Sequence, residues 1–197
     1  MKSIFIRSVL TATFFLTILS CESEKKKRVL NLPKTDLKAE NLIPMPMKIT
    51  PTEKGFALDE FTAIYTSENA VGFPEVGKFL AKKIKTKTDL DIPVNIEEVP
   101  GREGVIYINR SDSLELNAPE AYQLYITADS VILNSNTAEG AFRGVQTLRQ
   151  LIPESSIDTV ATYKVWSIPT GKIIDNPVFA YRGSMLDVAR HFFSVED

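Results

Sequence analysis

The sequence predicts an α+β fold, in which a mixed β-sheet has helices packed against it. Two observations support this prediction. Short segments rich in β-branched and aromatic residues, such as 61–66 and 105–109, are typical of strands, and residues 120–134 read as a hairpin. Residues 73–87 and 136–152 instead repeat apolar side chains every three or four positions, as amphipathic helices do. The predicted order of elements is therefore β-α-β-β-β-β-α-β, which favours a single layered domain.

The boundaries of this domain follow from local signals. Residues 43–51 contain three prolines and predict an extended, turn-rich segment before the first strand. Residues 92–97 have a strand pattern, and Pro93 favours a place at the edge of the sheet or at the start of a strand. A last strand is expected at 163–168, so the domain should occupy 41–168, and a connector should follow at 169–177.

The second helix carries the strongest signals. Asn136 and Glu139 have the spacing of a capping box, and Pro153 ends the helix. Gly140 and Gly144 lie inside it, where each glycine costs about 1 kcal/mol relative to alanine. Two glycines four residues apart predict close approach of another backbone, and packing against the sheet explains them better than a ligand does.

Composition excludes several classes of protein. The 197 residues carry a formal net charge of -2, which argues against a nucleic-acid-binding chain because such chains need a basic excess. One cysteine excludes an internal disulfide, and one histidine excludes a histidine-rich metal site. There is no glycine-rich phosphate loop and no zinc-helix motif. We therefore predict no metal and no cofactor.

The first twenty residues predict a secretory signal peptide. Lys2 and Arg7 give a positive start, and 9–19 is an uncharged apolar run too short to span a bilayer. The run ends at Cys21 in a sequence that resembles a bacterial lipobox, so Cys21 is the predicted lipidation site. Residues 21–40 lack apolar periodicity and predict a flexible tether. The expected location is the bacterial envelope, as an exported lipoprotein anchored in the membrane at its periplasmic face or at the cell surface.

Two stretches resemble the family-20 glycoside hydrolases, the β-N-acetylhexosaminidases. Residues 120–151 are similar to the end of that family's small amino-terminal helper domain, a hairpin followed by a helix with Gly-Ala-Phe-Arg-Gly-Val-Gln-Thr-Leu-Arg-Gln-Leu. Residues 179–193, Phe-Ala-Tyr-Arg-Gly-Ser-Met-Leu-Asp-Val-Ala-Arg-His-Phe-Phe, resemble the first strand of the catalytic (β/α)₈ barrel and the loop after it. Val178 departs from the arginine that the family often has there. The resemblance implies that 169–197 is a connector and the start of a truncated barrel.

The resemblance also implies a function. The complete protein would be an exo-β-N-acetylhexosaminidase that hydrolyses terminal β-linked N-acetylglucosamine or N-acetylgalactosamine with retention of configuration. In this family the 2-acetamido group of the sugar attacks C1, and an adjacent Asp-Glu pair stabilises the intermediate and transfers the proton, an exception to the two-carboxylate scheme. That pair lies on a later barrel strand, so the resemblance places no catalytic residue in this chain. We expect the chain alone to be inactive.

Arg182 matches the family's arginine at the floor of the sugar pocket, where it holds the hydroxyls at C3 and C4. The alternative is a strand arginine paired with a barrel carboxylate. Asp187 and Arg190 lie at and after the end of the same strand, and either pair with each other or support the site. His191 is a pocket group or, more in keeping with a lone histidine, a structural one. Trp166, the only tryptophan, precedes the barrel and is expected in the core.

Two other functions stay open at this point. The chain could be a non-catalytic surface lipoprotein, for glycan binding or adhesion, that keeps only the helper domain. It could also belong to another glycosidase that shares this domain, although residues 182–191 favour the hexosaminidases. In each case the expected partners are glycans, with N-acetylhexosamine for the enzyme, and a membrane reached through the lipid anchor.

Overall fold

The structure is a computed structural model that describes residues 32–68, 70–97, 103–112, 114, 118–157, 163–179, 181–185, 187 and 194. Its elements, in chain order, are η1 (Leu37–Ala39), β1 (Lys48–Leu58), β2 (Ala63–Thr66), α2 (Phe73–Thr88), β3 (Val94–Ile96), β4 (Val105–Arg110), β5 (Tyr122–Ile126), β6 (Ser130–Ser135), α3 (Ala138–Leu151) and β7 (Trp166–Asp175). The predicted helices and the predicted hairpin, which is β5 and β6, are confirmed.

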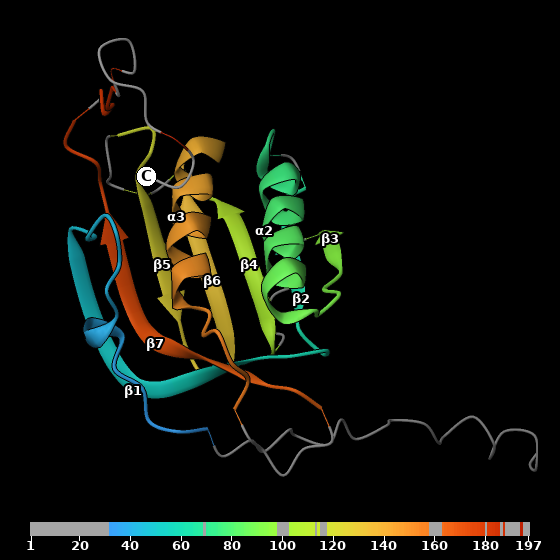
Figure 1. Ribbon diagram of the computed structural model, residues 1–197. Helices are drawn as coiled ribbons and strands as arrows, with labels where there is room; N and C mark the ends of the chain where they lie inside the picture. Colours follow the sequence, from blue (N-terminus) through green and yellow to red (C-terminus); the bar gives the residue numbers. More distant parts are fainter. Residues whose placement is uncertain are drawn as a thin grey trace, which may run out of the picture. The chain divides into compact units, whose positions relative to one another are not determined.

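The seven strands form one mixed sheet in the order β1-β7-β5-β6-β4-β2-β3. The pairs from β1 to β6 along this order are antiparallel, and the pairs from β6 to β3 are parallel. Helices α2 and α3 lie side by side on the same face of the sheet (Figure 1). The α+β class is therefore confirmed, and β3 lies at the edge that Pro93 predicts.

The two glycines of α3 are where the helix approaches the sheet. A Cβ atom at Gly144 would lie 2.3 Å from Leu133 Cδ1, and one at Gly140 would lie 2.3 Å from the carbonyl oxygen of Ala121. The prediction of packing against the sheet is confirmed. Between the helices, the rings of Phe79 and Phe142 lie 5.1 Å apart.

The cap of α3 differs from the prediction by one residue. Thr137, not Asn136, is the N-cap, and its side chain accepts a hydrogen bond from the backbone N–H of Gly140. The capping box predicted from Asn136 and Glu139 was therefore wrong. A threonine oxygen serves the same purpose, because it satisfies one of the N–H groups that have no partner within the helix.

The first strand was missed by the sequence reasoning. Residues 43–51 were expected to be a turn-rich segment, but β1 begins at Lys48 and continues to Leu58. Its pairing with β7 is interrupted between Pro51 and Gly55. There the Thr170 hydroxyl donates to the carbonyl oxygen of Lys54 at 2.7 Å and accepts from its N–H at 3.0 Å. The Thr170 hydroxyl thus provides hydrogen-bond partners for both backbone polar groups of Lys54 in the irregular segment.

Both ends of the folded region extend beyond the predicted limits. Strand β7 continues from Trp166 through Pro169 to Asp175, so the connector expected at 169–177 is mostly strand. Leu37 is fully buried in the core, so the end of the tether expected at 21–40 belongs to the fold. The predicted signal peptide and Cys21 lie outside the described residues. No helix in the described part of the chain is long and apolar enough to cross a membrane.

Candidate functional site

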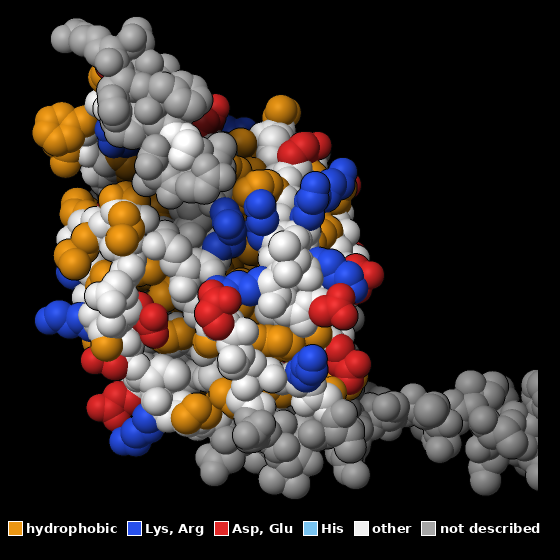
Figure 2. Space-filling view, viewed as in Figure 1, with side chains coloured by type: hydrophobic (Ala, Val, Ile, Leu, Met, Phe, Trp, Pro, Cys, Tyr) orange, Lys and Arg blue, Asp and Glu red, His pale blue; other side chains and the backbone are white. Residues whose placement is uncertain are grey.

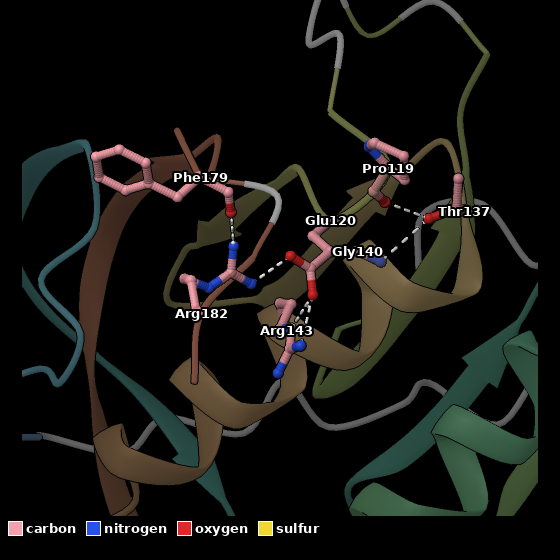
Figure 3. Close-up of polar contacts among 7 residues, drawn as sticks. All are labelled: Pro119, Glu120, Thr137, Gly140, Arg143, Phe179 and Arg182. Atoms are coloured by element: carbon pink, nitrogen blue, oxygen red, sulfur yellow. Dashed lines mark hydrogen bonds and ion pairs between the residues drawn. The ribbon is translucent and has the colours of Figure 1, made fainter. Parts of the chain in front are cut away.

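Arg182 lies in the segment that leaves the sheet after β7. Its guanidinium donates to the carbonyl oxygen of Phe179 at 2.5 Å and to the carboxylate of Glu120 (Figure 3). The Arg182 side chain is 41% exposed, so solvent reaches the guanidinium despite these contacts. Sequence reasoning left open a pairing of Arg182 with a barrel carboxylate, and the carboxylate that it contacts here is that of Glu120, just before β5 (Tyr122–Ile126).

Glu120 lies between two arginines. Arg143, on α3, donates from Nε and Nη2 to Glu120 Oε1 at 2.8 and 2.5 Å, while Arg182 binds Oε2 (Figure 3). The hydrogen bond from Arg182 and, to a smaller extent, that from Arg143 hold the pKa of the Glu120 carboxyl below its usual value. The carboxylate stays ionised and joins α3 to the segment that carries Arg182.

The backbone around Glu120 is fixed by the start of α3. The Thr137 hydroxyl donates to the carbonyl oxygen of Pro119 while it accepts from the N–H of Gly140 (Figure 3). The Ser135 hydroxyl donates to the carbonyl oxygen of Ala121 at 2.9 Å. These contacts fix the backbone on both sides of Glu120, so its carboxylate is presented at a defined place beside the helix.

A groove of about 1110 Å³ runs along this side of the domain. It is bounded by α3, the end of α2, residues 43–47, residues 175–179 and Arg182. Gln150 fixes one wall, because its amide accepts from the N–H of Ile43 at 2.9 Å and donates to its carbonyl oxygen at 3.0 Å. Lys and Arg side chains gather on this face (Figure 2). Those that line the groove are Lys83, Lys87, Arg143, Arg149 and Arg182.

The segment after β7 exposes large apolar side chains. Those of Val178, Phe179, Tyr181 and Met185 are all at least 71% exposed. The described residues after Asp175 form neither helix nor strand, so a barrel strand from Phe179 onward stays a prediction.

The other predicted residues have mixed outcomes. Trp166 is buried, with 4% of its surface exposed, and its place in the core is confirmed. Asp187 is exposed, whereas Arg190 and His191 lie outside the described residues. The described residues include no group of three His, Cys, Asp or Glu side chains that could hold a metal ion.

Glu120 and its contact with Arg143 were missed. The two positions are 23 residues apart, and Glu120 and Arg182 are 62 apart. No local spacing relates them, so only the topology brings them together. A weak signal was available, because Glu120 opens the hairpin whose second strand leads into α3.

Three comparisons relate the chain to known proteins. The family described as "Glycosyl hydrolase family 20, domain 2" matches residues 39–176. A β-hexosaminidase of Porphyromonas gingivalis is 38% identical over 92% of this chain and 22% of its own length. A β-N-acetylhexosaminidase of Cellulomonas fimi is 30% identical over 79% of this chain and 30% of its own length.

A solved structure is similar in fold. A mutant Streptomyces plicatus β-hexosaminidase, in complex with the product GlcNAc, superposes with a TM-score of 0.64 and 28% identity. The likeness covers 85% of this chain and 32% of that one. The chain thus spans between about a fifth and a third of the length of these relatives.

Proposed function

Because the chain belongs to glycosyl hydrolase family 20, we propose that it is the amino-terminal part of an exo-β-N-acetylhexosaminidase. The substrates would be glycans that end in β-linked N-acetylglucosamine or N-acetylgalactosamine. The observation that carries the proposal is the family match over 39–176, continued by Arg182 at the place where a sugar-binding arginine is expected. Relatives named as hexosaminidases, one of them in complex with GlcNAc, support the substrate class.

Arg182 is proposed to bind the C3 and C4 hydroxyls of the terminal sugar. Its planar guanidinium can donate to two adjacent oxygens at once, and it stays charged at any relevant pH. In this structure the same donors bind Glu120 and the carbonyl oxygen of Phe179. These two contacts use both terminal nitrogens of the guanidinium, the pair that would donate to the two hydroxyls of a sugar.

The reaction proposed for the complete protein uses the 2-acetamido oxygen of the sugar as nucleophile. An Asp-Glu pair beyond this chain would orient the acetamido group and move the proton. Nothing in residues 1–197 is assigned to these steps, so the chain itself should not turn over substrate. A chromogenic N-acetylglucosaminide tests this, because turnover by the purified 197-residue chain that persists through repurification would contradict the proposal.

Export and lipid anchoring are proposed from the first 21 residues. The apolar run followed by Cys21 supports acylation there, and several acyl chains hold a protein on a bilayer because each buried CH₂ contributes about 0.8 kcal/mol. Metabolic labelling with a fatty-acid analogue should mark the wild type and not a Cys21→Ser variant. Equal labelling of the two would rule out this anchor.

The role of Arg182 is tested in the full-length protein by Arg182→Lys. This variant keeps the charge but loses the planar two-point contact, and a lost hydrogen bond to a charged group costs about 1.5–3 kcal/mol. We expect kcat/KM to fall by roughly ten- to a hundredfold or more. Arg110→Lys is the matched control, because Arg110 is exposed and, within the described part of the chain, its guanidinium pairs with Asp112 alone.

A substrate that lacks the C3 or C4 hydroxyl separates binding from stability. The wild type should discriminate strongly against it, and Arg182→Lys should discriminate much less. If Arg182→Lys lowers the melting temperature while the folded fraction turns over normally, Arg182 is a structural ion-pair partner of Glu120, and the sugar-binding role is wrong.

A further inference from the structure

The face of the sheet opposite the helices carries uncharged polar and aromatic side chains. Helices α2 and α3 cover one face only, and no other helix or strand of the described residues lies on the opposite one (Figure 1). Successive residues of a strand point to opposite faces. In β5 and β6 the residues that face the helices are buried, whereas those on the open face are half-buried. In β4, Ile106 and Ile108 are buried on the helix side, and Tyr107 and Asn109 are half-buried on the open face.

Strand register places the open-face residues in two adjacent rows. Tyr107 of β4, Ile132 of β6 and Tyr125 of β5 lie opposite one another and form the first row. The second row consists of Asn109 and Asn134, two residues after the first row in β4 and β6, and Gln123, two residues before it in the antiparallel β5. We call these six residues the open-face patch.

The amide row has hydrogen-bonding groups that its neighbours do not use. Asn109 Nδ2 donates to Asn134 Oδ1 at 3.4 Å, and the Tyr125 hydroxyl donates to Gln123 Oε1 at 2.6 Å. These bonds hold the side chains in place. Among the described residues, the amide nitrogens of Asn134 and Gln123 and the amide oxygen of Asn109 make no hydrogen bond, and all three residues are half-buried. Two donor groups and one acceptor thus lie in a line across three strands.

The patch itself carries no charge. Lys172 of β7 lies opposite Tyr125 and has its Nζ 4.7 Å from the centre of the tyrosine ring. An exposed contact of this kind is weak, so a ligand can displace the ammonium. A single cation does not suit a phosphate backbone, which needs several. The tyrosine rings of the first row and the amides of the second row suit instead a neutral ligand, because the rings can pack on an apolar face and the amides can bond to hydroxyl groups.

We propose that the open-face patch is a second, non-catalytic binding surface for a β-linked N-acetylhexosamine chain. The identity of the sugar rests on the proposed function, whereas the neutral, hydroxyl-rich character of the ligand rests on the patch alone. The apolar face of a pyranose packs on Tyr107, Ile132 and Tyr125, and its hydroxyl and acetamido groups bond to the amide row. Neighbouring strands are about 4.8 Å apart, so the patch accommodates a short run of sugars.

Such a surface would act on a different part of the glycan from the hydrolytic site. An exo-hydrolase acts at a chain end, whereas the patch contacts sugars inside the chain. Binding there raises the local concentration of chain ends near the enzyme, as linked binding sites do.

The test is binding of a soluble tetramer of β-1,4-linked N-acetylglucosamine to the 197-residue chain, followed by ¹H–¹⁵N NMR. We expect the side-chain amide signals of Gln123 and Asn134 to shift, and signals from α2 to stay unchanged. Gln123→Ala and Asn134→Ala should each raise Kd by about fivefold, as expected for one neutral hydrogen bond. Lys78→Ala, on the exposed face of α2, is the control and should leave Kd unchanged.

Tyr125 separates stacking from hydrogen bonding. Tyr125→Phe keeps the ring and frees the Gln123 oxygen, so binding should persist, whereas Tyr125→Ala should weaken it. A melting curve of each variant identifies loss of folding. If Tyr125→Ala does not fold, the Tyr125→Phe variant still shows whether binding depends on the ring of Tyr125 or on its hydroxyl.

Several results would overturn the proposal. They are shifts confined to the helix face, a Kd unchanged in both amide variants, or equal binding of a sulfated polysaccharide that is lost in Lys172→Ala. Hydrolysis of a chromogenic N-acetylglucosaminide by the full-length wild type tests the proposed function separately. A protein that hydrolyses but has no patch binding refutes only this inference, and one that binds without hydrolysis refutes only the proposed function.

Discussion

Replacing Gly140 with alanine tests how the start of α3 positions Glu120. In an unobstructed helix this change should stabilise the fold by about 1 kcal/mol. Here the new Cβ would lie 2.2 Å from Ser135 Oγ and 2.3 Å from the carbonyl oxygen of Ala121. The serine side chain can rotate, but the carbonyl belongs to the backbone that leads into β5 and cannot move alone. The helix and the strand must separate.

The expected cost follows from these contacts. Overpacking costs about 1–3 kcal/mol, and displacement of the Ser135 hydroxyl breaks its bond to the Ala121 carbonyl, at about 1 kcal/mol. After the helix-propensity gain is subtracted, the free energy of unfolding should fall by about 1–3 kcal/mol. For a domain of this size the melting temperature should fall by roughly 3–12 °C.

Urea denaturation and thermal melting of Gly140→Ala measure this change. Gly144→Ala is the matched control, because the three atoms nearest to its Cβ would all belong to the side chains of Leu133 and Tyr122. Leu133 can change rotamer, so the control should lose less stability than Gly140→Ala. Hydrogen exchange at residues 119–121 should accelerate only in Gly140→Ala. If Gly140→Ala is as stable as the wild type, the close approach of helix and strand is not as described, and the reasoning is refuted.

Three further predictions concern single contacts. Glu120→Gln should lower the free energy of unfolding at neutral pH and not at low pH. The pKa of Glu120 is lowered in the folded state, so the carboxylate stabilises the fold above about pH 4.5, and this stabilisation is lost as pH falls through the folded pKa. An equal loss of stability at pH 7 and pH 3 would contradict this. Tyr122→Phe removes the hydroxyl bonded to Thr147 Oγ1 at 2.6 Å, which should cost about 1–3 kcal/mol in urea denaturation. Adding Thr147→Val should recover part of the loss, and a further loss would argue against the bond. Gln150→Ala should accelerate hydrogen exchange at Ile43 and leave α2 unchanged, and an unchanged rate at Ile43 would show that the amide does not hold this segment.

The periodicity of apolar residues was sufficient to predict a helix or strand where one face of the element is buried and the other is exposed. Both α helices have this property, and so have β5 and β6, whose alternating burial matches their alternating sequence. Strand β1 lacks it. Most of its first seven residues are exposed because β1 is an edge strand, so Thr, Pro, Glu and Lys occur where apolar residues would have shown a pattern. Nothing in the local sequence distinguishes such a strand from a loop.

A proline explains why the predicted last strand ended at residue 168 although β7 continues to Asp175. Pro169 was taken as the end of a strand because proline cannot donate to a ladder. It pairs with Gly55 at the border of the irregular segment of β1, where the ladder changes register. The identity of Arg182 came from a motif, but its contact with Glu120 depends on the order of strands in the sheet. Long-range contacts of this kind cannot be read from spacing in one sequence.

The burial of Trp166 gives the protein an internal optical reporter. It is the only tryptophan in the chain, and it lies opposite Leu58 at the last pair of the β1–β7 ladder. Strand β1 has a neighbour on one side only, so it can separate from the sheet by breaking its ladder with β7 alone. The emission of one indole therefore reports on this ladder, and a red shift that precedes the loss of helical circular dichroism would reveal the edge strand opening before the rest of the domain unfolds.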